Sequence, residues 1–354
     1  MQPDQQSERP RGTRVHYPIE TAVLRRARIE VEARYNLLMS KQPNIIIADE
    51  SALFFYEHIP ALSQYGAQAF RGNPLTNCAS SGEGFAHFNA EHPLYGGKPV
   101  SVLVAAASAR RQSADVASRY CTCDLPAGSF LKLRDNLFLA SPELVFARMG
   151  NLVSDIRLAE IGLNLCGRYY KNLDTGDIDD RRELITTPAR IKRYLDKTPK
   201  LRGAAKARKA LRWVVGNSGS PAESKMKLQF GNPLWSGGLG LPFTHMNYDI
   251  SAGRLAALTE QNEFCIDLVN PNLMQGIEYD GAVHQDAGKD KRRRNALEAL
   301  GWHVFPIDKS VLYNAEATKQ AGMQIARHLG IRLQFPKRWQ EKYEHLRREL
   351  QLPV

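Results

Sequence analysis

The alternation of apolar and polar positions is clearest in the C-terminal third of the chain. Three short runs there have the spacing and residue types of β-strands: Met246–Ile250, Phe264–Val269 and Gln275–Asp280. Ser220 and Pro221 predict the start of a helix before them, with serine as the cap and proline in the first turn. A second helix is expected from about Lys289 to Leu300, ended by Gly301, and a last strand from His303 to Ile307. This order of elements predicts an α/β arrangement with a mixed central sheet.

The N-terminal half predicts a mixed α+β domain. Its β-type runs are Asn44–Ala48, Pro99–Ala106 and a strand, turn and strand over Phe130–Leu139. A helix is expected to open at Ser51, with that serine as its cap. Ser141 followed by Pro142 predicts another helix start, and this helix is expected to lead through Arg148 towards Cys166.

Changes in composition divide the chain into five expected segments. They are a polar tail at 1–14, an α+β domain at 15–180, a basic helical linker at 181–215, an α/β domain at 216–335 and a basic helix at 336–354. The tail is expected to be disordered and is neither a signal peptide nor a membrane anchor. The stretch GNSGSPAE, Gly216–Glu223, is the expected boundary before the second domain.

Positive charge is concentrated in two places. The net charge is +11, and the window Arg181–Arg212 alone holds twelve Lys and Arg against two acids. The second basic cluster consists of Lys289, Lys291, Arg292, Arg293 and Arg294. Such concentrations favour a polyanionic partner, because neutralising phosphates releases counterions. The alternative for the first window is a solvated helix face.

The overall composition is that of an ordinary globular protein, with 43% apolar and 24% charged residues. Every apolar run is shorter than the roughly 18 residues that a membrane-spanning helix needs, so no membrane partner is expected. The five cysteines are an odd number and form no C-x-x-C pair. This favours reduced thiols in a cytoplasmic protein.

Three carboxylates share one face of the last predicted hairpin. The segment 271–274 is rich in turn residues and fits a four-residue loop. With that loop Asp267 opposes Glu278, at roughly 5 Å between the Cβ atoms. Asp280 lies on the same face, two residues further on. The alternate positions are expected to build core: Ile266, Leu268, Ile277 and Tyr279.

Facing carboxylates repel each other, so this pattern needs a compensating cation. Mg²⁺ or Mn²⁺ would fit, because oxygen ligands on rigid strands suit these ions. The other solution is ion pairing with the second basic cluster. The residues alone leave both solutions open.

A longer pattern joins these acids to their surroundings: Asp267, then Glu278-x-Asp280-Gly281 and His284, then Asp290-x-x-Arg293, Leu297, Gly301-Trp302 and Val304. It resembles the strand–strand–helix–strand core of the Vsr-like predicted endonucleases of the PD-(D/E)XK superfamily. Together with Ser220–Glu223, Gly237–Pro242 and Asn247, the resemblance covers Gly216–Ile307, about a quarter of the chain. It implies a restriction-endonuclease-like α/β fold for 216–335 and Mg²⁺-dependent hydrolysis of DNA, and it is consistent with defence or mobile-element biology.

The resemblance also implies roles for single residues. Asp267 and Glu278, with Glu223 from the preceding helix, would hold one or two Mg²⁺ or Mn²⁺ ions. The superfamily has lysine where this chain has Asp280. The group that orients or deprotonates the attacking water is therefore open among Asp280, His284 and a lysine of the second basic cluster. That cluster would grip the phosphodiester backbone next to the cut site.

Two functions remain open at this stage. One is a metal-dependent nuclease. The other is a catalytically inactive nucleic-acid-binding module that acts as an antitoxin or repressor, which the missing lysine favours. A weaker resemblance links 15–180 to the region that precedes such nuclease domains in proteins similar to abortive-infection AbiEi antitoxins. Its features are the Ser51–Pro60 helix, the strand at 99–105 and the strand and helix at 138–146. Nucleic acid, with DNA expected, is the partner in both cases.

Overall fold

The computed structural model describes residues 42–79, 83–85, 88, 93–181, 183–259, 261–281 and 287–354. The tail predicted at 1–14 and the candidate residue His284 lie outside this part of the chain. The side chains of Lys289 and Asp290 lie outside it as well. Helices and mixed sheets alternate through the described residues, which confirms the predicted α/β class.

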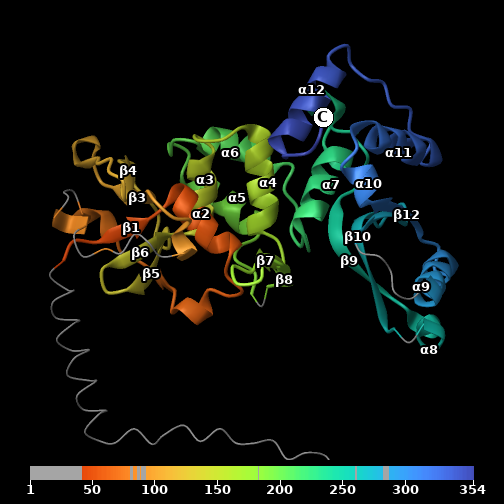
Figure 1. The fold of residues 1–354 in the computed structure, drawn as a ribbon, viewed down its shortest axis with the longest axis horizontal. Helices are drawn as coiled ribbons and strands as arrows, with labels where there is room; N and C mark the ends of the chain where they lie inside the picture. The colour runs from red at the N-terminus through yellow and green to blue at the C-terminus, as the bar shows by residue number, and fades with distance from the viewer. Residues whose placement is uncertain are drawn as a thin grey trace, which may run out of the picture. The chain divides into compact units, whose positions relative to one another are not determined.

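The first sheet has six strands in the order β2-β5-β6-β1-β3-β4 (Figure 1). Their bounds are β1 Ile45–Ile47, β2 Gln68–Phe70, β3 Val100–Val104, β4 Val116–Tyr120, β5 Phe130–Arg134 and β6 Leu137–Ala140. The pairs β1–β6 and β3–β4 are parallel, and the other pairs are antiparallel. The β-type runs predicted around 44–48, 99–106 and 130–139 are therefore confirmed.

In the described residues this half of the chain contains the α-helices α2 Asp49–Glu57, α3 Pro142–Met149, α4 Asp155–Leu165, α5 Pro188–Lys197 and α6 Ala204–Leu211. Ser141 caps α3 as predicted, since its side chain accepts from the N–H of Leu144. The prediction for Ser51 was wrong, because the cap position of α2 is Ala48. The Ser51 hydroxyl instead accepts from the N–H of Ser101 at 2.9 Å. The helix predicted towards Cys166 is two helices, and Ser154 caps the second.

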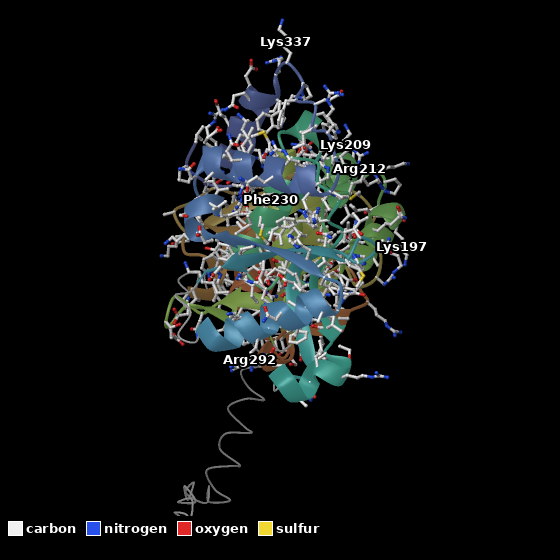
Figure 2. The ribbon with its side chains drawn as sticks, turned by 90° about the vertical axis from the view of Figure 1, so that its right-hand side faces the viewer. Lys197, Lys209, Arg212, Phe230, Arg292 and Lys337 are labelled. Carbon is white, nitrogen blue, oxygen red and sulfur yellow. The ribbon has the colours of Figure 1, made fainter. Side chains whose placement is uncertain are left out.

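The basic window 181–212 forms two amphipathic helices. The apolar side chains of α5, such as Ile191 and Leu195, are buried, and so are Ala204, Ala207 and Ala210 of α6. The cations lie on the other face, and Lys197, Lys209 and Arg212 point outward in Figure 2. A short two-stranded sheet, β7 Tyr169–Lys171 with β8 Ile178–Asp180, precedes them.

The second sheet has four strands in the order β12-β11-β10-β9, shown in green to blue in Figure 1. In chain order, the strands of this sheet and the helices around them are α7 Pro221–Gly231, β9 His245–Ser251, α8 Ala256–Thr259, β10 Glu263–Asn270, β11 Gln275–Asp280, α9 Ala287–Ala299 and β12 His303–Asp308. Strand β10 is antiparallel to its neighbours β9 and β11, and β12 is parallel to β11. Gly301, at a φ of 86°, follows α9 and turns the chain into β12. Each of the strands and helices predicted for this region is present.

The C-terminal segment consists of α10 Lys309–Leu312, α11 Ala315–His328 and α12 Trp339–Glu349. The guanidinium of Arg347 is fully buried and donates to the side chain of Gln229 in α7 and to the carbonyl of Pro353, both at 2.6 Å. The Trp339 indole donates to the carbonyl of Gly238 at 2.9 Å. The bond to Gln229 joins α12 to α7, and the bond to Gly238 joins it to the loop that follows α7. None of the helices in the described ranges combines the length and the apolar character that a membrane crossing requires.

Helix α7 carries an unusual buried lysine. Lys227 is only 6% exposed, and burial alone lowers the pKa of its ammonium to about 8 from an ordinary value of 10.5. A Cβ atom at Gly231 would lie 2.5 Å from its Nζ, so this glycine leaves the room that the amine occupies. A charged Lys227 therefore costs stability at neutral pH.

Replacing Lys227 by methionine is expected to stabilise the protein at pH 7 by up to about 3 kcal/mol. The folded state releases the Lys227 proton near pH 8, whereas the unfolded chain holds it to about 10.5. Wild-type stability should therefore rise relative to the variant between these two values. Urea unfolding at pH 7 and pH 10 measures both effects. Lys209→Met, at an exposed position of α6, is the control, and a destabilised Lys227→Met would contradict the expectation.

Candidate functional site

The hairpin of β10 and β11 has the predicted register. Leu268 pairs with Ile277, and Asn270 pairs with Gln275, so the loop is 271–274 as expected. The side chain of Asn270 accepts from the N–H of Asn272 at 3.1 Å and so stabilises the turn. Three of the four predicted core positions, Ile266, Leu268 and Ile277, are buried, and the fourth, Tyr279, is half-buried.

Asp267 lies where the backbone pairing of the two strands ends. The Leu268–Ile277 pair is the last one, and beyond it the Asp267 carboxylate accepts from the N–H of Tyr279 at 2.7 Å. A side chain thus takes the place of the next backbone acceptor. Burial, and then repulsion from Glu223, raises the pKa of Asp267 to about 7, and Glu278 adds to the rise. The other two predicted metal ligands, Glu223 and Glu278, are therefore close enough to Asp267 to repel its charge.

Glu223 approaches this point from the first turn of α7. Ser220 caps the helix as predicted by accepting from the N–H of Glu223, which is 8% exposed. The Glu223 Oε2 accepts from the N–H of Gly219 at 2.7 Å and from the side-chain amide of Asn247 at 2.6 Å. Burial is the main cause that raises the pKa of Glu223. These bonds hold the carboxylate in one orientation, and they also serve as a helix cap.

Asn247 of β9 is the residue that ties Glu223 to the sheet. Its backbone has a φ of 45°, and its amide also donates to the carbonyl of Asn217 at 2.7 Å. A cavity of about 580 Å³ opens beside these two asparagines and is also lined by Arg168 and Tyr248. Basic side chains and aromatic rings are the groups with which proteins contact the phosphates and bases of single strands.

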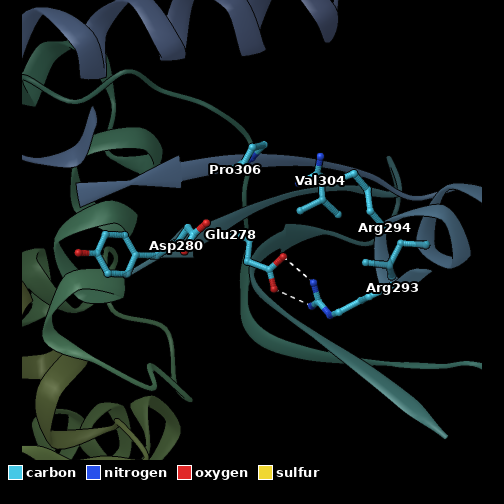
Figure 3. Close-up of a pocket in the computed structure, with 8 residues that line it drawn as sticks. Glu278, Asp280, Arg293, Arg294, Val304 and Pro306 are labelled. Atoms are coloured by element: carbon cyan, nitrogen blue, oxygen red, sulfur yellow. Dashed lines mark hydrogen bonds and ion pairs between the residues drawn. The ribbon is translucent and has the colours of Figure 1, made fainter. Parts of the chain in front are cut away.

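Glu278 forms an ion pair with Arg293 of α9. The two guanidinium nitrogens lie 2.6 and 2.7 Å from the two carboxylate oxygens (Figure 3), and Nη2 also donates to the carbonyl of Cys265 at 2.7 Å. This bidentate geometry is the strongest form of such a pair. Of the two compensating cations that the sequence left open, an arginine of the second basic cluster is the one present at Glu278.

The pair forms part of the wall of a cavity of about 330 Å³. Asp280 and Arg294 also line this cavity, as does Pro306 of β12. In the register of the sheet Asp280 lies beside Asp308. The remaining described side chains of the second basic cluster, Lys291, Arg292 and Arg294, are exposed. Arg293, by contrast, turns towards Glu278, and the sequence did not predict which cation of the cluster does so.

The donor chemistry of this site fits Mg²⁺ or Mn²⁺. Hard carboxylate oxygens come from α7, β10 and β11, and burial, with repulsion from Glu223 and Glu278, keeps the pKa of Asp267 high. The side chains as they lie do not yet form a complete ligand set. Within the described ranges no three His, Cys, Asp or Glu residues are close enough to hold one ion. Glu278 would have to exchange Arg293 for the metal.

These residues and their geometry are the basis on which the function has to be argued. No family model, curated protein or solved structure matches the chain. The likeness to Vsr-like endonucleases therefore remains a prediction from the sequence.

Proposed function

We propose that this protein hydrolyses phosphodiester bonds in DNA with the help of Mg²⁺ or Mn²⁺. The observation that carries the proposal is that the buried Asp267 of β10 lies near enough to Glu223 of α7 and to Glu278 of β11 to be repelled by both. Burial and repulsion from Glu223 raise the pKa of Asp267 to about 7. Carboxylates whose pKa is raised so far by burial and by neighbouring acids are typical of functional sites rather than of ordinary surfaces. The order of α7, three antiparallel strands, α9 and a parallel β12 supports the same proposal.

The residues of the site would divide the work. A bound divalent ion would stabilise the charge that develops on the scissile phosphate and activate a water molecule. Glu223 is oriented by Gly219 and Asn247, and Asp267 by Tyr279, so these two carboxylates need little rearrangement. Arg293, once released from Glu278, has the fork geometry that binds a phosphate oxygen pair. The exposed cations of α9 would hold the backbone on either side.

Cleavage of labelled single- and double-stranded DNA in Mg²⁺ and in Mn²⁺ tests the proposal. Glu278→Gln is expected to lower the cleavage rate by about 100-fold, because a neutral amide is a poor ligand and cannot balance the ion. Glu263→Gln, at an exposed position of β10, is the matched control and should cut like the wild type. Cleavage that survives Glu278→Gln would contradict the assignment of the site.

One observation favours a second candidate, an inactive nucleic-acid-binding module of the antitoxin or repressor kind. Both oxygens of Glu278 are engaged by Arg293, and Asp280 stands where the superfamily has lysine. Tight, salt-sensitive DNA binding without cleavage in either metal would establish this function instead. In both cases we place the protein in the cytoplasm, where its five free cysteines would stay reduced.

A further inference from the structure

A second cavity, which shares no residue with the carboxylate site, is lined by basic side chains. It measures about 320 Å³ and lies among α3, the end of β4, the segment after β4 and the turn between α5 and α6. Five cations line it: Arg110, Arg119, Arg148, Lys200 and Arg202. No Asp or Glu is part of its lining. Segments that are far apart in the sequence thus bring positive charges together in one cavity.

A close backbone contact builds this cavity. Gly203 has a φ of 99°, and a Cβ atom there would lie 2.4 Å from the carbonyl oxygen of Ala147 and 3.0 Å from the nitrogen of Asn151. Only glycine lets the turn between α5 and α6 approach the end of α3 so closely. The contact brings Lys200 and Arg202 next to Arg148, and Arg202 donates to the side chain of Asn151 at 3.0 Å.

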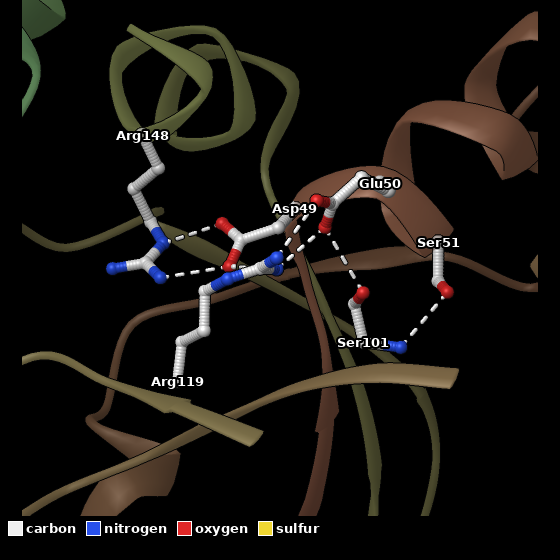
Figure 4. A network of polar contacts seen from close by, with 6 residues as sticks. All are labelled: Asp49, Glu50, Ser51, Ser101, Arg119 and Arg148. Carbon is white, nitrogen blue, oxygen red and sulfur yellow. Dashed lines mark hydrogen bonds and ion pairs between the residues drawn. The ribbon is translucent and has the colours of Figure 1, made fainter. Parts of the chain in front are cut away.

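Two of the five cations are held in place by acids behind the cavity. Asp49 accepts from Nε and Nη2 of Arg148 at 2.7 and 2.8 Å, and Glu50 accepts from Nη2 of Arg119 at 2.8 Å (Figure 4). The third guanidinium nitrogen of Arg148 points away from Asp49 in the same view. Arg148 is 8% exposed, so its orientation is fixed before any ligand arrives.

The other three cations give the cavity its excess charge. Arg110, Lys200 and Arg202 are exposed, and the described residues offer none of them an ion pair with an acid. Five cations against Asp49 and Glu50 leave three positive charges. Cys121 and Cys123 also line the cavity, with 3.3 Å between their sulfurs. Burial raises the pKa of Cys123 to about 12, so this thiol stays neutral and does not reduce the excess.

We propose that this cavity binds a phosphate monoester. A phosphate monoester carries close to two negative charges at neutral pH, and it is a terminal group that is bonded to the rest of the ligand through one oxygen. Such a group suits cations that converge from three segments. A backbone phosphodiester carries one charge and continues on both sides, so it needs an open groove instead. A cavity of about 320 Å³ holds a ligand of nucleotide size. The ligand is either the phosphorylated end of a nucleic acid or a free nucleotide, and the inference does not rest on the proposed cleavage.

Calorimetry on the full chain in EDTA, with AMP compared to adenosine, tests the free-nucleotide form of the proposal. Anisotropy with one single-stranded DNA, carrying either a 5′ phosphate or a 5′ hydroxyl, tests the nucleic-acid form. The phosphorylated member of at least one pair is expected to bind about tenfold more tightly, because its phosphate forms charge-assisted hydrogen bonds that the other member cannot form. Which pair shows the difference identifies the source of the phosphate.

Variants of the exposed cations decide whether the cavity is responsible. Lys200→Ala and Arg202→Ala should each weaken the phosphorylated probe about tenfold and leave the probe without phosphate unchanged. Lys209→Ala, exposed on α6 and outside the cavity, should leave both unchanged. Equal binding within both probe pairs would overturn the proposal. So would a phosphate preference that survives both cavity variants. Because no metal is present, neither result depends on whether the carboxylate site cuts DNA.

Discussion

Replacing Asp49 by asparagine is expected to lower the free energy of unfolding by about 3–5 kcal/mol. The Asp49 side chain is fully buried, and it pairs with Arg148 through two hydrogen bonds of 2.7 and 2.8 Å. Asparagine has nearly the same shape and tolerates the φ of 50° at this position. The variant therefore removes the charge without disturbing the backbone, and it leaves the buried Arg148 guanidinium without its counterion.

Urea unfolding of the two proteins measures this effect. Asp135→Asn is the control: it breaks a surface ion pair in which the side chain of Asp135 is 39% exposed and that of Lys132 is 41% exposed. This change should lower the free energy of unfolding by less than about 1 kcal/mol. Adding Arg148→Met to Asp49→Asn should recover part of the loss, because it removes the uncompensated charge. If Asp49→Asn costs no more than Asp135→Asn, the buried pair does not hold α2 to α3.

The same acid shows why one helix start could not be predicted. Ser141 and Ser220 cap their helices as expected, because a serine hydroxyl bonds to the N–H three residues later and this contact is local. Ser51 was also expected to be a cap, although alanine rather than proline follows it, and α2 begins two residues earlier, at Asp49. The carboxylate that lies there is held by an arginine 99 positions away. A contact between residues so far apart in the sequence cannot be recognised from the residues around the helix start.

The carboxylate site was predictable as far as the strand register determines it. A side-chain period of two and a four-residue loop predict which residues face each other. The observed pairing follows this register up to Leu268 and Ile277, one position before Asp267 and Glu278, and repulsion from Glu278 contributes to the raised pKa of Asp267. The identity of the compensating cation was not fixed in this way. It depends on which face of α9 turns towards β11, and that face carries Arg293. The second cavity could not be predicted from the sequence either, because it depends on how closely Gly203 approaches Ala147.

Replacing Asp267 by asparagine is expected to stabilise the metal-free protein at pH 8 by up to about 4 kcal/mol. Burial, followed by repulsion from Glu223, raises the pKa of Asp267 to about 7 from an ordinary value of 3.8. Between these values the folded state keeps a proton that the unfolded chain has released, so wild-type stability falls as the pH rises. Asparagine stays neutral and can still accept from the N–H of Tyr279, so this cost disappears.

Urea unfolding in EDTA at pH 4 and pH 8 measures the difference between the two proteins, with Glu263→Gln as the control on the same strand. The difference should be close to zero at pH 4 and largest at pH 8. A difference that does not change with pH would contradict the raised pKa of the buried Asp267. Mg²⁺ added in place of EDTA at pH 8 should then stabilise the wild type, because the ion binds the ionised carboxylate, and leave Asp267→Asn unchanged. An equal response of both proteins would remove Asp267 from the ligand set, whatever the cleavage assay shows.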